Sequence, residues 1–303
     1  MCEQLDEGVL LDLCHEYLYV IDTIFNLTED TKIEAFVIVS DGINNCIFDI
    51  RAITKIIENS FYSRPHKKDL LLGFLKELYD NFGYVPTRSL FSVGEFRFYV
   101  NEYFNFGWNT DDESYTQSDK YIFVVSQDDI ELFKHIYFCI FTQRDLNQLL
   151  NTAAKYGSIM CFKFLISHGA VVRNTTLSSA FAGGNREIIN ICTSYIGSLD
   201  PRLIDINQAI FTNVNDILIE YEKKHNFKFS IERCIDAFNV RLFIHEIAKG
   251  LNINKALYYS MFFGIYKLSK FLIDNGANVN YKHGIWRETP LMQCSVNDSY
   301  EIS

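Results

Sequence analysis

The stretch from Leu149 to Arg173 constrains the fold more than any other feature, because its pattern predicts two short helices joined by a tight turn. The first helix has a narrow inner face, since Ala153 and Ala154 let a neighbouring helix come close. We expect Gly157 to end this helix, because glycine adopts the positive φ of a C-terminal cap without steric cost. The second helix carries apolar residues at helical spacing and ends at Gly169. Two such helices cannot bury their apolar faces alone, so we expect stacked copies of the pair.

A second copy of this pattern lies near the C-terminus. Gly264 stands in the place of Gly157, and the sequence NGANVN at 275–280 places another Gly-Ala pair at the end of the second helix. TPLM follows at 289–292. This combination resembles the ankyrin repeat, whose helix pair ends in Gly-Ala-Asp/Asn-Val-Asn and restarts with Thr-Pro-Leu-His. Met292 replaces the usual histidine, but Thr289 as N-cap and Pro290 at the first helical position still predict a helix start.

Small residues on the first helix of each pair serve as markers of the repeat. The predicted markers are Ala153, Ala180, Ala209, Ala237, Ser260 and Cys294. Only the last step, from Ser260 to Cys294, is close to the ankyrin length of about 33 residues. The shorter steps predict helix pairs without the β-turn finger that projects between ankyrin repeats. The segment from Cys234 to Gly250 is the least regular copy.

The chain is expected to divide in sequence order. Residues 1–106 read as a separate helical region, 107–120 as a polar and acidic linker, and 121–303 as ankyrin-type repeats that are degenerate to about 250 and regular from about 256. The helices expected in the first region are Glu7–Leu27, Lys32–Val39, Ile47–Asn59 and His66–Phe82, with one or two more between Ser89 and Phe106. The chain ends a few residues into a second helix, so we expect the last repeat to be truncated.

Composition narrows the class of protein. Apolar residues make up 48% of the chain, which is enough for a large core and argues against disorder. The net charge of −10 argues against a nucleic-acid partner. The acidic N-terminus does not resemble a secretory signal, and no apolar stretch approaches the roughly 18 residues of a membrane span. The eight cysteines are scattered singly, without zinc-ligand spacing. We therefore expect a cytoplasmic protein in a reducing compartment, without metal or cofactor and without membrane insertion.

Catalytic motifs are not found in the sequence. Cys14 and His15 are adjacent, so on a helix they point about 100° apart and cannot form a nucleophile–base pair. His135, His168 and His245 lie near expected helix ends, where histidine more often caps carbonyl groups than binds metal. The basic cluster at Arg64–Asp69 reads as a solvated helix start, with an anion or phosphate site as the alternative.

The order of these segments resembles a known family. It is a large group of ankyrin-repeat proteins, expanded in some flagellate protists, in which an uncharacterised helical domain precedes regular ankyrin repeats. The segments that carry the resemblance are Ser63–Leu78, Ser126–Ile136, Ala153–Leu165, Ala180–Ile189 and Ser260–Asn280. The resemblance implies an all-α, ankyrin-type helical solenoid that binds proteins. It implies no catalytic residues, because the family has no established activity.

One group of residues is a candidate binding site. Tyr281, Lys282, His283, Trp286 and Arg287 lie in the one inter-repeat finger of full length. Aromatic residues and arginine exposed together are typical of the hot spots of protein interfaces. The alternative is that Trp286 folds back over the helix of the next repeat.

The sequence therefore favours a non-enzymatic scaffold that binds unidentified protein partners through its concave face and this finger. Two alternatives stay open: a truncated copy of a longer array without function, and an enzyme housed in residues 1–106. The oligomeric state is not assigned.

Overall fold

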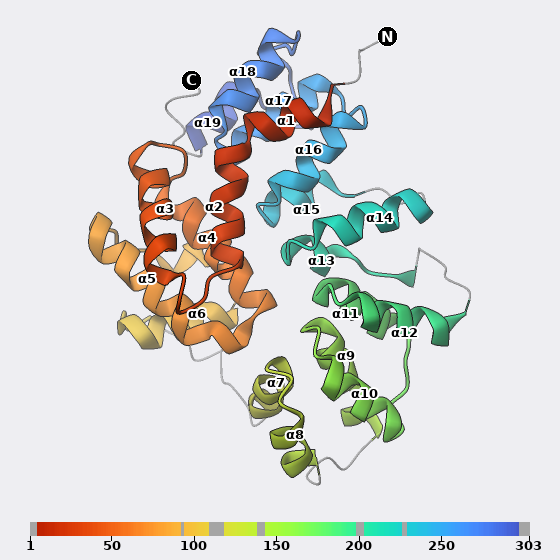
Figure 1. Cartoon of the computed structure of the whole chain (residues 1–303). Coiled ribbons are helices and arrows are strands. Elements are labelled where there is room, and N and C mark those ends of the chain that lie inside the picture. Colours follow the sequence, from red (N-terminus) through yellow and green to blue (C-terminus); the bar gives the residue numbers. More distant parts are fainter. Residues whose placement is uncertain are drawn as a thin grey trace. The chain divides into compact units, whose positions relative to one another are not determined.

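The computed structural model describes residues 5–91, 94–108, 118–137, 143–197, 203–225 and 229–296 (Figure 1). These residues form helices and no β-sheet; an isolated antiparallel bridge pairs His283 with Glu288. The all-α prediction is confirmed. Most of the predicted linker at 107–120 and the predicted truncated helix after 296 lie outside the described residues.

The contacts divide the chain into two compact units. The terminal unit combines residues 1–56 with 229–303, and the middle unit contains residues 57–228. Helix α4, Ile50–Ser63, contains the point of division. The units do not follow the expected sequence-order division at 106, because the N-terminal helices pack against helices from the other end of the chain. The domain boundaries themselves stay a prediction.

The middle unit is built around a stack of helix pairs. Its elements are η1 (Pro65–Lys67), α5 (Lys68–Phe82), η2 (Arg88–Leu90), α6 (Gly94–Phe104), α7 (Ser118–Ser126), α8 (Ile130–Tyr137), α9 (Gln143–Lys155), α10 (Ile159–Ser167), α11 (Asn174–Gly183), α12 (Arg186–Ile196), α13 (Asn207–Phe211) and α14 (Asn215–His225). The first helices form one row, in which α9 packs against α7 and α11, and α11 against α13. The second helices form another row, in which α10 packs against α8 and α12. This is a helical repeat-like fold.

The terminal unit contains two more helix pairs and the N-terminal helices. Its elements are α1 (Glu7–Leu13), α2 (His15–Phe25), α3 (Lys32–Asn44), α15 (Ile231–Asp236), α16 (Val240–Ala248), α17 (Ile253–Phe263), α18 (Tyr266–Asp274) and α19 (Pro290–Val296). The first helices again form a row, in which α17 packs against α15 and α19. Helix α1 packs against both α16 and α18, the second helices of the two pairs.

Left-handed backbone at one residue marks the turn within each of these helix pairs. The residues are Asp128, Gly157, Gly184, Asn213, Phe238 and Gly264, all with φ between 54° and 71°. They recur at nearly even intervals along the chain. The prediction for Gly157 is confirmed. The predicted marker Ala237 is wrong, because the turn residue of its pair is Phe238 and the buried small residue of α15 is Cys234. The pair α15–α16 is therefore a regular copy that a bulky turn residue conceals in the sequence.

Several predicted helix bounds in the first hundred residues need correction. The helix expected over Glu7–Leu27 is interrupted at Cys14, whose backbone leaves the helical region at φ −102° and ψ 7°. Helix α3 continues to Asn44, beyond the predicted end at Val39, because Gly42 is tolerated inside it. Helix α4 starts and ends later than expected, and the segment after Phe82 forms η2 and α6.

The N-terminal helices are joined to the C-terminal pairs by specific bonds within the terminal unit. The buried Tyr17 hydroxyl donates to the Phe263 carbonyl at the end of α17. Glu7 Oε1 lies 3.1 Å from the buried His245 Nδ1, and Lys267 Nζ donates to Glu16 at 2.8 Å. Apolar residues of α1 and α2 are therefore buried against repeats that come from the opposite end of the sequence.

The described cysteines serve mainly as core residues. Cys14, Cys161, Cys192, Cys234 and Cys294 are buried and reduced, and Cys46 is exposed. No helix within the described ranges combines the length and apolar character needed to cross a bilayer.

Candidate functional site

A tight turn at residues 283–288 lies between α18 and α19, at the place of the predicted finger, and is called the finger below. His283 and Glu288 exchange two backbone hydrogen bonds, of 2.8 Å and 3.0 Å, and the Arg287 amide donates to the Gly284 carbonyl. The tip is almost fully solvated: Ile285 is 88% exposed and Trp286 is 81% exposed. An apolar pair held in solvent at the end of a hydrogen-bonded turn is a surface suited to contact another molecule.

The base of the finger is anchored to α17 by aromatic and polar contacts. The His283 ring stacks on Tyr258, with centroids 4.3 Å apart, and its Nε2 lies 3.2 Å from the Tyr259 hydroxyl. The Tyr258 hydroxyl donates to Glu288 at 2.6 Å. Both residues of the β-bridge are thus fixed to neighbouring tyrosines of one helix, which holds the finger in place.

A carboxylate on α15 extends this network. The Tyr259 hydroxyl donates to Glu232 Oε1 at 2.8 Å, and Ser230 donates to Oε2 at 2.9 Å. Hydrogen bonds from its own backbone amide, and then from Tyr259 and Ser230, lower the pKa of Glu232. Burial, and then the bond to Glu232, raise the pKa of Tyr259 well above that of a free phenol. Near neutral pH the phenol therefore stays the donor and the carboxylate stays charged.

The five residues predicted as a binding site do not share one environment. Lys282, Trp286 and Arg287 are exposed, whereas Tyr281 and His283 are half-buried. The Tyr281 and His283 rings lie 6.2 Å apart. The alternative that Trp286 folds back over the next helix is wrong, since its side chain is in solvent. Sequence reasoning missed Ile285, the most exposed apolar residue of the tip.

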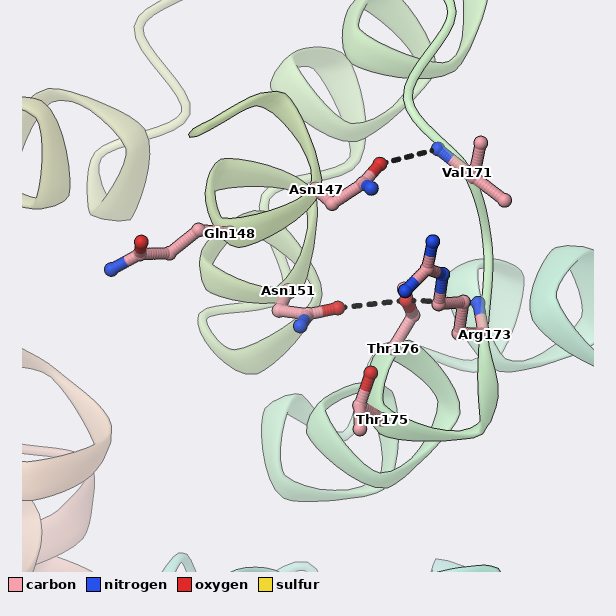
Figure 2. A pocket seen from close by; sticks show the side chains of 7 residues that line it. All are labelled: Asn147, Gln148, Asn151, Val171, Arg173, Thr175 and Thr176. Carbon is pink, nitrogen blue, oxygen red and sulfur yellow. Dashed lines mark hydrogen bonds between the residues drawn. The ribbon is translucent and has the colours of Figure 1, made fainter. Parts of the chain in front are cut away.

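A second candidate site is a pocket in the middle unit (Figure 2). Its volume is about 400 Å³. The wall residues come from α9, the loop after α10 and the start of α11: Asn147, Gln148, Asn151, Val171, Arg173, Thr175 and Thr176. All of these side chains except that of Val171 are polar, and Arg173 carries the formal charge among them. The sequence analysis did not predict this pocket.

Hydrogen bonds between the helices and the loop fix the pocket walls. The Val171 amide donates to Asn147 Oδ1 at 2.8 Å, which ties the loop to α9. The Arg173 amide donates to Thr176 Oγ1 at 3.1 Å, and that hydroxyl donates to Asn151 Oδ1 at 2.7 Å. In Figure 2, Asn151 and Thr176 point toward each other beside the Arg173 guanidinium, while Gln148 extends away from them. Thr176 is almost fully buried, so this part of the wall is preformed.

The same tie between first helix and loop recurs in the terminal unit. Asn254 Oδ1 accepts from the Asn278 amide at 2.7 Å, as Asn147 does from Val171. The loops also end their second helices alike, because Ala170 donates to the Leu165 carbonyl and Ala277 to the Leu272 carbonyl, both at 3.0 Å. The sequence signal that could have indicated this bond between helix and loop was an asparagine at the same position of both first helices, Asn147 and Asn254.

The cysteine and histidine residues that the sequence analysis weighed for catalysis or metal binding make contacts of a structural kind. Burial raises the pKa of Cys14 to about 12, so its thiol stays protonated, and its neighbour His15 stacks on Tyr19 instead. His168 Nδ1 lies 2.8 Å from the Phe164 carbonyl, as expected for a cap, whereas His245 faces Glu7. Within the described ranges, no three His, Cys, Asp or Glu side chains are grouped as a metal site would need.

The basic cluster after α4 is more buried than a solvated helix start. The His66 side chain is half-buried on η1, which packs against α5 and α7. Burial, and then repulsion from Lys67 and Arg64, lowers the pKa of His66. The prediction of a solvated cluster is therefore wrong for His66.

Comparison with known proteins gives one partial match. Residues 169–246 match a family described as a domain of unknown function, DUF3447. The matched segment is about a quarter of the 303-residue chain and runs from Gly169 into α16. Domains of this kind are known to occur in ankyrin-repeat proteins. No curated protein matches the chain.

Proposed function

We propose that this chain is a non-enzymatic protein-interaction scaffold of the ankyrin type. It binds one or more partner proteins through the finger at 283–288 and through the faces of the first helices. The observation that carries this proposal is the exposed Ile285–Trp286 tip on a base anchored by Tyr258 and Tyr259. Tryptophan and arginine dominate the residues whose truncation weakens protein interfaces, and Arg287 follows directly.

The rigid base strengthens the proposal. A binding segment that is already ordered loses little conformational entropy on association, so more of the contact energy contributes to affinity. The hydrogen bonds across the finger and the stacking of His283 on Tyr258 provide this order.

The stacked architecture and the family match support the same interpretation. Rows of first helices offer an extended surface of the kind that repeat proteins use for binding. The DUF3447 segment lies within these rows. The ankyrin assignment, the protist family and a cytoplasmic location are parts of the proposal.

Affinity capture from a lysate of the source cell tests the scaffold. The wild-type chain and an Ile285→Ser, Trp286→Ala variant are compared, with Ile33→Ala on α3 as control, because Ile33 is equally solvent-exposed at 82%. We expect a defined set of proteins to bind the wild type and the control but not the finger variant.

Two outcomes would contradict the proposal in different ways. The same proteins on all three chains would exclude the finger and move binding to the helix rows. Nothing bound by a sample that circular dichroism shows to be folded would reject the scaffold itself.

A further inference from the structure

Hydrogen bonds within the protein engage three of the acceptor oxygens in the wall of the α9–α11 pocket. Asn147 Oδ1, Asn151 Oδ1 and Thr176 Oγ1 each accept a proton from the protein, and the Thr176 proton is itself donated to Asn151. The Asn151 amide, whose oxygen accepts from Thr176, presents its nitrogen to the pocket, and that nitrogen can only donate. The Arg173 guanidinium and the Asn151 nitrogen therefore offer donors to a ligand, beside Gln148 and Thr175, whose side chains can both donate and accept.

These donors include a cation and an amide that are open to the pocket. The Arg173 guanidinium forms no ion pair within the described residues, and the Asn151 amide nitrogen has no acceptor there. Thr175 is exposed at the rim and adds a hydroxyl. A guanidinium beside neutral donors matches an acceptor group of one negative charge, since Arg pairs with a carboxylate through two parallel bonds.

The equivalent position in the terminal unit is filled by rings. When Asn147 is aligned with Asn254, Asn151 corresponds to Tyr258, whose ring stacks on that of His283 with centroids 4.3 Å apart. The helix-pair geometry alone thus does not create the cavity. In the middle unit the small amide side chain of Asn151 stands at the position that the terminal unit fills with the Tyr258 ring.

We propose that this pocket binds the carboxylate of a glutamate or aspartate on an extended segment of a partner protein. The inference rests on the proposed scaffold function and names what one of its surfaces recognises. A carboxylate suits the site better than a phosphoryl group, which carries about two charges and usually recruits several cations. The loop at 170–173 and α9 bound the hollow that the acidic side chain would enter, while the backbone of the extended segment would stay outside it, because the Val171–Asn147 bond joins the two walls.

A random-peptide display selection on the full chain tests this proposal. Affinities of the strongest peptide are then measured by fluorescence anisotropy. We expect an acidic residue to be enriched at one position. Replacing it by the isosteric amide, or making Arg173→Met, is expected to weaken binding about tenfold, as for loss of one charge-assisted hydrogen bond. The two changes together are expected to weaken binding no more than either alone, because each removes the same contact.

Matched variants separate binding in the pocket from binding elsewhere on the chain. Arg173→Met keeps the backbone amide that donates to Thr176. Arg186→Met serves as the control, because it removes an exposed arginine that pairs with Glu220 outside the pocket. Unchanged affinity in Arg173→Met, no acidic preference, or stronger binding of phosphoserine than of glutamate would each overturn the proposal. Peptides lost with Trp286→Ala but kept with Arg173→Met would overturn it while supporting the finger.

Discussion

The Tyr17 hydroxyl donates a hydrogen bond to the Phe263 carbonyl, although the two residues are 246 positions apart in the chain. Both groups are buried, and Phe263 directly precedes the turn of its helix pair at Gly264. The bond therefore joins the N-terminal helices to a repeat beside its left-handed turn residue.

Removing this hydroxyl should destabilise the terminal unit. We expect Tyr17→Phe to lower the free energy of unfolding by about 1 to 2 kcal/mol, because a buried carbonyl loses its donor. Urea denaturation followed by circular dichroism measures the change. Tyr19→Phe on the same helix is the control, since Tyr19 is half in solvent. Equal effects of the two changes would show that the bond contributes nothing specific.

Gly183 and Gly197 should respond to alanine for different reasons. A Cβ at Gly183 would lie 2.1 Å from the Ala154 carbonyl oxygen, where α11 packs on α9. A Cβ at Gly197 would meet nothing, but φ there is 73°. We expect Gly183→Ala to cost about 3 kcal/mol or more by overpacking, and Gly197→Ala about 1 kcal/mol by backbone strain alone. Comparable unfolding midpoints for the two variants would contradict the close approach of α9 and α11.

The Glu232 network should make stability depend on pH. The pKa of Glu232 is lowered in the folded state, so its contribution is complete above its unfolded pKa of about 4.3 and is lost as pH falls through the folded value. We expect the difference in urea midpoint between wild type and Glu232→Gln to be largest above about pH 5 and to shrink below about pH 4. Glu34→Gln, at an exposed residue of α3, is the control and should show no such trend. A difference that grows on acidification would have the wrong sign for this network.

Substitutions at the tip of the finger should change the free energy of unfolding much less than substitutions at its base. We expect Trp286→Ala to change the free energy of unfolding by less than about 0.5 kcal/mol, because its side chain is in solvent. We expect Tyr258→Phe to lower it by about 1 kcal/mol, because Glu288 loses its hydrogen bond. Thermal or urea unfolding of both variants is the measurement. A clear destabilisation by Trp286→Ala would mean that the ring packs against the protein.

Thiol reactivity should follow burial. We expect Cys46 to react rapidly with an aromatic disulfide reagent under mildly alkaline conditions, since it is exposed. Cys14, Cys161 and Cys192 should react only on unfolding, because burial raises the pKa of each thiol to about 12. Peptide mapping of the labelled sites, with a Cys46→Ser variant as control, distinguishes them. Rapid labelling of Cys161 in native protein would contradict the packing of α10.

The repeating helix pairs could be predicted from sequence where glycine marks the turn. Gly157 and Gly264 were found in this way because glycine adopts the left-handed region without cost. Phe238 was missed, since a bulky residue with positive φ is uncommon and is stabilised only by its surroundings. Its ring packs against Tyr17 and Phe263, and Tyr17 lies far away in sequence.

The candidate sites were predictable to different degrees. Trp286 and Arg287 were predicted because exposed aromatic residues and arginine together are typical of interface hot spots. The exposure of Trp286 is confirmed, and its role in binding stays a prediction. The α9–α11 pocket was missed because asparagine and threonine are common in helices and caps. Only the bond from Thr176 to Asn151 shows which end of that amide faces the cavity.

The packing of α1 on α16 and α18 also sets an order of events during synthesis. Glu7 is 238 positions ahead of its partner His245, so it meets that residue only when most of the chain has been made. At translation rates of about 5 to 20 residues per second, this takes roughly 10 to 50 seconds. During that time the side of α1 that packs on α16 and α18, and the Tyr17 side of α2, lack their native cover, although α3 can already pack on α2. The middle unit can fold as it emerges. The terminal unit is thus completed last, and chaperone dependence should concentrate on the nascent α1 and α2.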